Sequence, residues 1–190
     1  SRHVSIQSVE KAVPQNADAE VIDYGDSLIM PSFVDMHLHA PQYPMLGMGM
    51  DLPLLDWLNT YTFNTESAFK DKDFARETYR ALAHEMIANG TTRVCAFSSL
   101  HREATLILMD EFEKAGLTGF VGKVNMDRNS GDVLTETTEE SMRETLAWRA
   151  CVHVGQRIKQ SDDFSVVQNK ITVFQNFQFA RRGGMDNVAL

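Results

Sequence analysis

Two histidines separated by one residue, His37 and His39, are the residues of this 190-residue chain whose types and spacing point to chemistry. They end the apolar segment 33–38, whose composition is typical of a β-strand. Side chains alternate between the two faces of a strand, so both imidazoles are expected on the same face. Two imidazoles so placed can bind one cation, and imidazole suits zinc, iron and related metals. The spacing therefore predicts a metal site where this strand ends.

The segments that must position this pair alternate between strand and helix patterns. Pro31, Asn89-Gly90 and Gly116 punctuate them, and Asp71 or Asp73 can cap the second helix. The alternation implies parallel strands joined by right-handed crossovers, and the strand that carries the pair is expected to be covered on both faces. The expected strands are residues 4–6, 20–23, 27–30, 33–38, 91–97, 120–124 and 171–179; the expected helices are residues 54–61, about 72–88, 103–114 and about 138–150, with a long loop over residues 39–51.

Composition excludes several classes of protein. The net charge of −8 comes without a basic run, which argues against binding to nucleic acid or to an anionic membrane surface. Cys95 and Cys151 lie far apart and form no C-x-x-C pair, so neither a disulfide framework nor a zinc knuckle is indicated, and a reducing cytoplasm is expected. No apolar stretch reaches the roughly 18 residues that a membrane span needs. The start of the chain has no initiator Met and no signal peptide, which predicts a front end that is processed, excised or incomplete.

The segment 30–39, with the sequence MPSFVDMHLH, resembles the first barrel strand of the amidohydrolase superfamily, although Ser32 stands where that family most often has Gly. Within the superfamily, the continuation is similar to the guanine deaminases. The similarity covers roughly residues 19–148. The segments that carry it are APQY at 40–43, DLPLLDWL at 51–58, YTF at 61–63, NGTT at 89–92, FVGKV at 120–124 with Met126-Asp127, and TTEES at 137–141.

The resemblance implies an α/β fold in which a partial TIM-like (β/α) barrel follows a few short β-strands. Residues 1–31 would be the remnant of an N-terminal β-sandwich region, residues 32–150 the first βα units of the barrel, and residues 151–190 a divergent tail. The carboxyl ends of barrel strands form the catalytic rim of such folds, which is where the histidine pair falls. A closed eight-stranded barrel needs about 250 residues, so the chain is expected to be an incomplete enzyme.

The activity that the resemblance implies is zinc-dependent hydrolysis of guanine to xanthine and ammonia. His37 and His39 would bind zinc, and His39, Ala40, Pro41 and Gln42 would line the purine pocket. A homodimer is implied as well. The family's remaining groups are two histidines, an aspartate and a proton-shuttling glutamate from later strands, and no residue of this chain matches them, so no catalytic residue is assigned. His101, after the strand at 91–97, is expected to be a loop or helix-start residue.

Two other functions stay open from the sequence. The protein could be an amidohydrolase that removes an amino or chloro group from another nitrogen heterocycle. It could instead be a catalytically inactive fragment, since a catalytic zinc site usually takes three protein ligands and only two are recognised.

Overall fold

The computed structural model describes residue 22, residues 24–159 and residues 171–173, and the chain divides into two units, Ser1–Pro31 and Ser32–Leu190. In chain order the elements are β1 (Phe33–His39), the 3₁₀ helix η2 (Ala40–Met45), α2 (Leu54–Trp57), the π-helical turn η3 (Leu58–Thr62), α3 (Phe63–Ser67), the 3₁₀ turn η4 (Ala68–Lys70), α4 (Lys72–Ala88), β2 (Thr91–Phe97), α5 (Arg102–Ala115), β3 (Thr118–Gly122), α6 (Thr138–Lys159) and β4 (Ile171–Val173).

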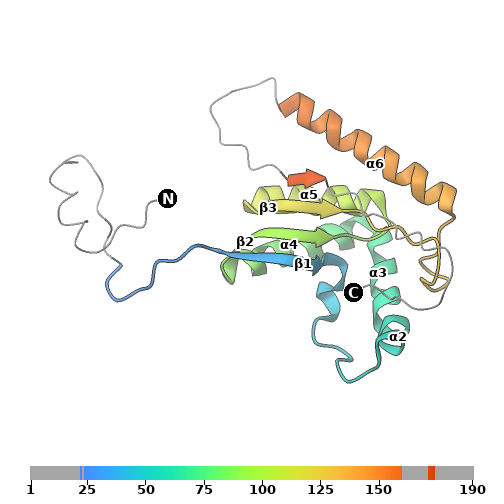
Figure 1. Cartoon of the computed structure of the whole chain (residues 1–190), viewed down its shortest axis with the longest axis horizontal. Coiled ribbons are helices and arrows are strands. Elements are labelled where there is room, and N and C mark those ends of the chain that lie inside the picture. Colours follow the sequence, from blue (N-terminus) through green and yellow to red (C-terminus); the bar gives the residue numbers. More distant parts are fainter. Residues whose placement is uncertain (1–21, 23, 160–170, 174–190) are drawn as a thin grey trace. The chain divides into compact units, whose positions relative to one another are not determined.

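The four strands form one parallel sheet in the order β1-β2-β3-β4, as Figure 1 shows. In this register His39 lies opposite Phe97, and Phe97 lies opposite Gly122, so three strands end together. Parallel neighbours need crossover connections, and α4 and α5 supply them between β1, β2 and β3. The α/β class predicted from the alternating pattern is therefore confirmed. The described strands make an open sheet, and closure into a barrel stays a prediction.

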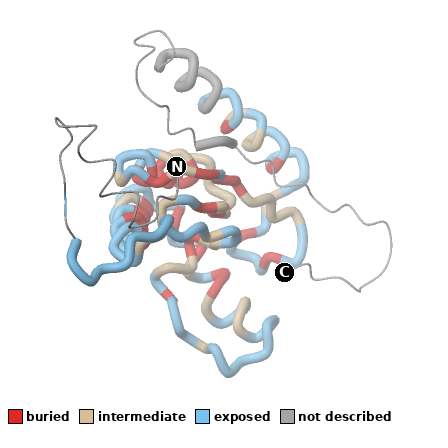
Figure 2. The backbone as a smooth tube through the Cα atoms, turned by 60° about the vertical axis from the view of Figure 1, so that its left-hand side comes forward, coloured by how far each residue is buried: buried red, intermediate tan, exposed pale blue. Residues whose placement is uncertain are grey.

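Helices α4 and α5 pack against each other and against the sheet, and their contact forms the core. Figure 2 shows the buried residues concentrated where these helices meet the strands. Asp71 begins α4, because its carboxylate accepts hydrogen bonds from the backbone of Asp73 at 2.9 Å and of Phe74 at 3.1 Å. The helix buries Ala75, Tyr79, Leu82, Ala83 and Met86, whose spacing places them along one side of it. The core residues with the largest side chains are Phe69, Tyr79, Leu82, Met86, Ile107, Leu108, Phe112 and Leu117.

Glycine is required at two places around α5 and β3. Gly116 follows α5 with φ of +83°, the left-handed conformation that commonly ends a helix. Gly119, in β3, has φ of +135°, and a Cβ built on it would lie 1.9 Å from the carbonyl oxygen of Val94. The close approach of β3 to β2 therefore excludes every other residue from position 119.

β1 is more exposed than its apolar sequence predicted. Met36 is 74% exposed, Phe33 is 55% exposed and Val34 is 51% exposed. In the described sheet β1 is an outer strand, with β2 as its only neighbour. The expectation that this strand is covered on both faces is therefore wrong for the described part of the chain.

Several boundaries also differ from the sequence prediction. The segment expected as a loop begins with η2, because Pro41 fixes φ at a value that suits the first turn of a helix. The helical stretch that begins at Leu54 continues through η3 and α3 to the end of η4. Strand β3, Thr118–Gly122, lies two residues earlier than the strand expected over residues 120–124, because its pairing with β2 ends at Gly122. Helix α6 continues past the expected end to Lys159, in a stretch without proline.

In the first unit, residue 22 and residues 24–31 contain no helix or strand. The strand expected over residues 27–30 is therefore wrong. Ser27 instead closes a turn by donating its backbone N–H to Tyr24 O at 3.2 Å. The described residues of this unit offer no neighbouring strand to pair with. The strands expected over residues 4–6 and 20–23 fall wholly or largely outside the described residues, as does the part of 171–179 after Val173. Among the helices described, none is both long enough and apolar enough to cross a membrane.

Candidate functional site

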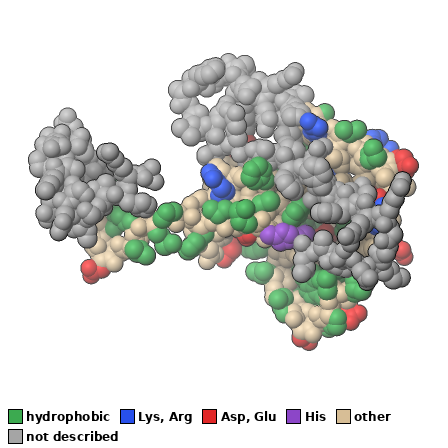
Figure 3. All heavy atoms as spheres, viewed as in Figure 1, with side chains coloured by type: hydrophobic (Ala, Val, Ile, Leu, Met, Phe, Trp, Pro, Cys, Tyr) green, Lys and Arg blue, Asp and Glu red, His purple; other side chains and the backbone are tan. Residues whose placement is uncertain are grey.

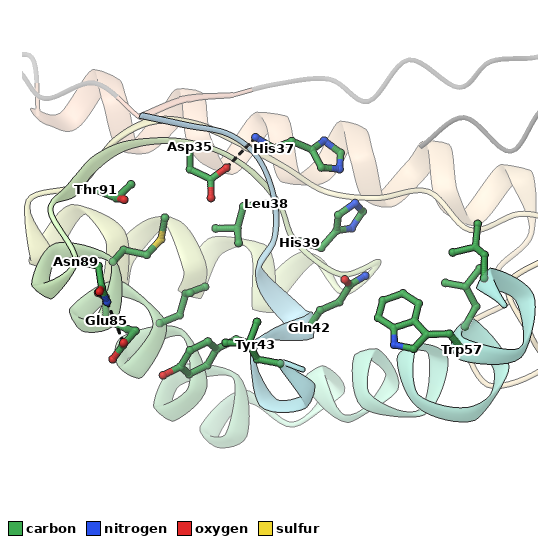
Figure 4. Close-up of a pocket in the computed structure, with 15 residues that line it drawn as sticks. Asp35, His37, Leu38, His39, Gln42, Tyr43, Trp57, Glu85, Asn89 and Thr91 are labelled. Carbon is green, nitrogen blue, oxygen red and sulfur yellow. Dashed lines mark hydrogen bonds between the residues drawn. The ribbon is translucent and has the colours of Figure 1, made fainter. Parts of the chain in front are cut away.

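Three aromatic rings gather where β1 and β2 end. The ring centroids of His37 and His39 are 5.0 Å apart, with an interplanar angle of 66°. The ring of Phe97, the last residue of β2, lies 5.3 Å from that of His37 and 5.2 Å from that of His39. Figure 4 shows both imidazoles extending in the same direction from β1, and Figure 3 shows histidine side chains gathered in one patch. The alternation of side chains along a strand predicted this shared direction.

Asp35 holds the backbone of β1 just before the histidine pair. Its Oδ1 accepts a hydrogen bond of 3.0 Å from the backbone N–H of His37. The pairing of β1 with β2 shifts register between Asp35 and Leu38, so the stretch that carries His37 departs from a regular ladder. The side chain of Asp35 thus satisfies a backbone donor at this irregular point.

The electrostatic surroundings of His39 favour its uncharged form. Burial lowers the pKa of His39 below its usual value, and the neighbouring His37 lowers it further. The neutral imidazole is the form that binds a metal ion, because its free nitrogen lone pair becomes the ligand bond.

The spacing of the two imidazoles fits a single metal ion. Zinc binds histidine nitrogen at about 2.0–2.1 Å in tetrahedral geometry, which places the centroids of two ligating rings about 5 Å apart. The observed 5.0 Å between the His37 and His39 rings agrees with that spacing. No group of three or more His, Cys, Asp or Glu side chains able to hold a metal together occurs among the described residues. The spacing is compatible with the predicted ligand pair, whose role in binding a metal stays a prediction, and such a site needs at least one further ligand.

An open cavity of about 690 Å³ lies along β1 beside the histidine pair. Trp57 contributes its indole to the wall, where its Nε1–H donates to the carbonyl oxygen of Met48 at 2.9 Å. Most of the other wall residues come from β1, η2, α2 and α4. Those that carry polar groups or aromatic rings are Asp35, His37, His39, Gln42, Tyr43, Trp57, Glu85, Asn89 and Thr91.

Gln42 reaches this cavity from η2 and is tied to a buried glutamate. Its Nε2 donates to Oε1 of Glu66 at 3.1 Å, and Glu66, on α3, is only 5% exposed. Burial raises the pKa of Glu66 to about 7, and the hydrogen bond from Gln42 opposes part of that rise. Behind them, the hydroxyl groups of Tyr79 and Ser98 form a buried hydrogen bond of 3.1 Å. A buried polar layer therefore supports the cavity.

Sequence reasoning missed Glu66. The signal available was its position three residues after Phe63, since both residues occupy the buried side of α3. A glutamate at a buried helical position needs a polar partner, but the identity of that partner could not be read from spacing alone.

Two other residues predicted to line the purine pocket lie outside the cavity wall. Ala40 and Pro41 are buried in η2 and do not line the cavity, so their contact with a substrate stays a prediction.

His84 is exposed on α4, away from the cavity wall. His101 is the residue immediately before α5, the helix-start position expected for it, and its Nε2 is buried without a hydrogen-bond partner.

Comparison with known sequences and structures places this geometry among similar proteins. The sequence model of the amidohydrolase family matches residues 28–182. The chain is similar to the guanine deaminase of Dictyostelium discoideum, with 42% identity over 152 residues, and to that of Rattus norvegicus, with 50% identity over 117 residues. These matches cover 76% and 61% of this chain. The chain spans only 34% and 26% of the length of these two relatives.

The structure is similar to a crystal structure of guanine deaminase from C. acetobutylicum with guanine bound in the active site. The TM-score is 0.71 at 38% sequence identity, and the match covers 85% of this chain and 36% of that one. The described parallel sheet and its helices therefore follow the course of a known structure over most of this chain.

Proposed function

This chain belongs to the amidohydrolase family, and from that premise we propose that the protein hydrolyses guanine to xanthine and ammonia, with this chain supplying the first part of the site. Family membership confirms the resemblance noted in the sequence. Members of this family are typically metal-dependent hydrolases, and the guanine deaminases are among those that act on C–N bonds. The choice of guanine is supported by relatives of that activity in a vertebrate, an amoeba and bacteria.

The observation that carries the proposal is the pairing of His37 and His39 at the carboxyl end of β1. Their rings have the spacing expected of two ligands on one ion, and the lowered pKa of His39 favours the ligating form. Zinc is the metal we propose. When bound, zinc supplies Lewis acidity and lowers the pKa of water to about 7, which provides the nucleophile that hydrolysis needs.

Gln42 is the residue of this chain that we propose to contact the purine. Guanine carries both donors and acceptors around its rings, and a carboxamide can donate through its nitrogen and accept through its oxygen. Trp57 and Tyr43 add aromatic surface to the same cavity, against which a planar base can lie. The net reaction replaces the 2-amino group with oxygen from water and releases ammonia.

The first test measures zinc content and xanthine formation on the purified chain, side by side. Stoichiometric zinc with turnover would support the proposal and show that this chain forms a working site. Zinc binding without turnover would support the two-ligand assignment alone. Neither zinc nor turnover would favour the inactive-fragment alternative for the isolated chain, and turnover of a different heterocycle would replace guanine as the substrate.

A segment exchange tests the proposal beyond the isolated chain. Residues 32–150 would replace the corresponding segment of the C. acetobutylicum enzyme. We expect the chimera to bind zinc and to deaminate guanine. A folded chimera that binds zinc but leaves guanine untouched would contradict the proposed substrate.

Matched variants separate metal binding from purine binding. His37→Ala should abolish most of the zinc content and activity of the chimera, whereas His84→Ala, at an exposed position of α4, should change neither. Gln42→Ala should weaken guanine binding while zinc content stays near normal. Retention of zinc and activity by His37→Ala would refute the ligand assignment.

The homodimer and the cytoplasmic location stay predictions.

A further inference from the structure

We propose that Glu66 is a positioning residue that holds the Gln42 carboxamide in one orientation, with its amide nitrogen turned inward and its oxygen offered to the cavity. The proposal rests on the proposed function only for the identity of the ligand. The orientation of Gln42 itself is a property of the ligand-free chain and is testable without a substrate.

The contact between the two side chains is specific and partly buried. Nε2 of Gln42 lies 3.1 Å from Oε1 of Glu66, within the normal range of a hydrogen bond. Glu66 is 5% exposed, so water has little access to compete for its oxygens. The two residues are 24 positions apart in the sequence, and they meet because α3 packs against η2.

The chemistry of a carboxylate determines which end of the amide faces it. Above its pKa of about 7, Glu66 is ionised and only accepts hydrogen bonds, so it can pair with the NH₂ group of Gln42 and not with its oxygen. A glutamine at position 66 could donate or accept, and it would permit either orientation. Glutamate therefore provides directional information that its neutral isostere does not.

Keeping a carboxylate in this position is costly, because burial penalises its charged form. A residue that served only to fill the space or to satisfy Gln42 would not need that charge. Tyr79, whose hydroxyl is already paired with Ser98, lies close enough to Glu66 for the Glu66 charge to raise its own pKa. Among the interactions that shift the pKa of Glu66, none comes from a cation.

The consequence for recognition concerns the atom that Gln42 presents. With one of its two N–H donors held by Glu66, the carboxamide is fixed so that its oxygen is the acceptor offered to a ligand, and Gln42 extends toward His39 in the view of Figure 4. A carbonyl oxygen selects an N–H donor. On guanine the donors on the pyrimidine ring are N1–H and the 2-amino group, and hypoxanthine lacks only the second. Pairing of the Gln42 oxygen with the 2-amino group would therefore make Glu66 favour guanine over hypoxanthine.

The test reads the Gln42 side-chain amide by NMR in the ¹⁵N-labelled chain at pH 8, with the signal assigned by its loss in Gln42→Ala. We expect hydrogen exchange of this NH₂ group to be at least about tenfold slower in the wild type than in Glu66→Leu, the ratio that corresponds to one hydrogen bond of about 1.4 kcal/mol. Glu66→Gln, which keeps the shape and an acceptor, should fold normally and show an exchange rate between those of the wild type and Glu66→Leu, because its amide group permits both orientations of Gln42. An exchange rate in Glu66→Leu equal to that of the wild type would overturn the proposal.

A second measurement links the orientation to ligand choice. Guanine and hypoxanthine, which lacks the 2-amino donor, are titrated into the wild type and Glu66→Gln. We expect the wild type to prefer guanine by about tenfold and Glu66→Gln to lose most of this preference. An equal preference in both proteins would refute the role in ligand choice. Glu66-dependent amide protection without any response to guanine would leave the positioning role supported and would count against the proposed function alone.

Discussion

The buried Glu66 makes a sharp prediction about stability and pH. Its pKa rises from 4.5 to about 7 in the folded chain because burial penalises the carboxylate. The folded state therefore holds this proton more tightly than the unfolded chain does. Between pH 4.5 and 7 unfolding releases the proton, so the free energy of unfolding falls as the pH rises and the loss is complete above pH 7.

The magnitude follows from the size of the shift. A difference of this size between folded and unfolded pKa corresponds to about 3 kcal/mol. Glu66→Gln removes the titrating group and keeps a hydrogen-bond acceptor for Gln42. The stability of this variant relative to the wild type should therefore increase by about 3 kcal/mol between pH 4.5 and pH 8.

Urea unfolding followed by tryptophan fluorescence measures this difference, since Trp148 is fully buried and Trp57 lines the cavity. Contributions from other titrating groups are common to both proteins and cancel in the comparison. Glu77→Gln makes the same chemical change at an exposed position of α4, and its effect should stay within about 0.5 kcal/mol at every pH. A stability difference for Glu66→Gln that does not vary with pH would refute the reasoning.

Three further sets of substitutions test the fold. Gly119→Ala should cost about 3 kcal/mol or more, because its Cβ would collide with the backbone of Val94; a melting temperature close to that of the wild type would contradict this packing. Asp71→Ala should cost about 1 kcal/mol through loss of the α4 cap, and Asp71→Asn should restore most of it in urea unfolding. Tyr79→Phe should cost about 1 kcal/mol, because the buried hydroxyl of Ser98 loses its partner, and the double variant with Ser98→Ala should cost less than the sum of the two single changes.

Local patterns were sufficient to predict most of the elements. The strand expected over residues 91–97 is β2, and the helix expected over residues 103–114 extends by one residue at each end. Asp71 begins α4 and Gly116 ends α5, as their side-chain chemistry and conformational freedom predicted. These signals are local, since caps and apolar periodicity act within a few residues of one another.

Predictions that depended on a neighbour were less reliable. The apolar sequence of β1 indicated burial, yet exposure depends on whether another strand or helix covers it. Strand β3 has shifted ends because its pairing with β2 decides where it stops. Helix α6 continues past its expected end because the sequence encodes the end of a helix only weakly.

For the site, the sequence by itself determined that His37 and His39 share one face of a strand end, because alternation along a strand is a property of the backbone. Only the tertiary structure decided that Phe97 lies against both imidazoles and that Glu66 holds Gln42 from 24 residues away. Such contacts join segments whose separation is set by the packing of β1, β2, η2 and α3, and no local pattern in the sequence encodes that packing.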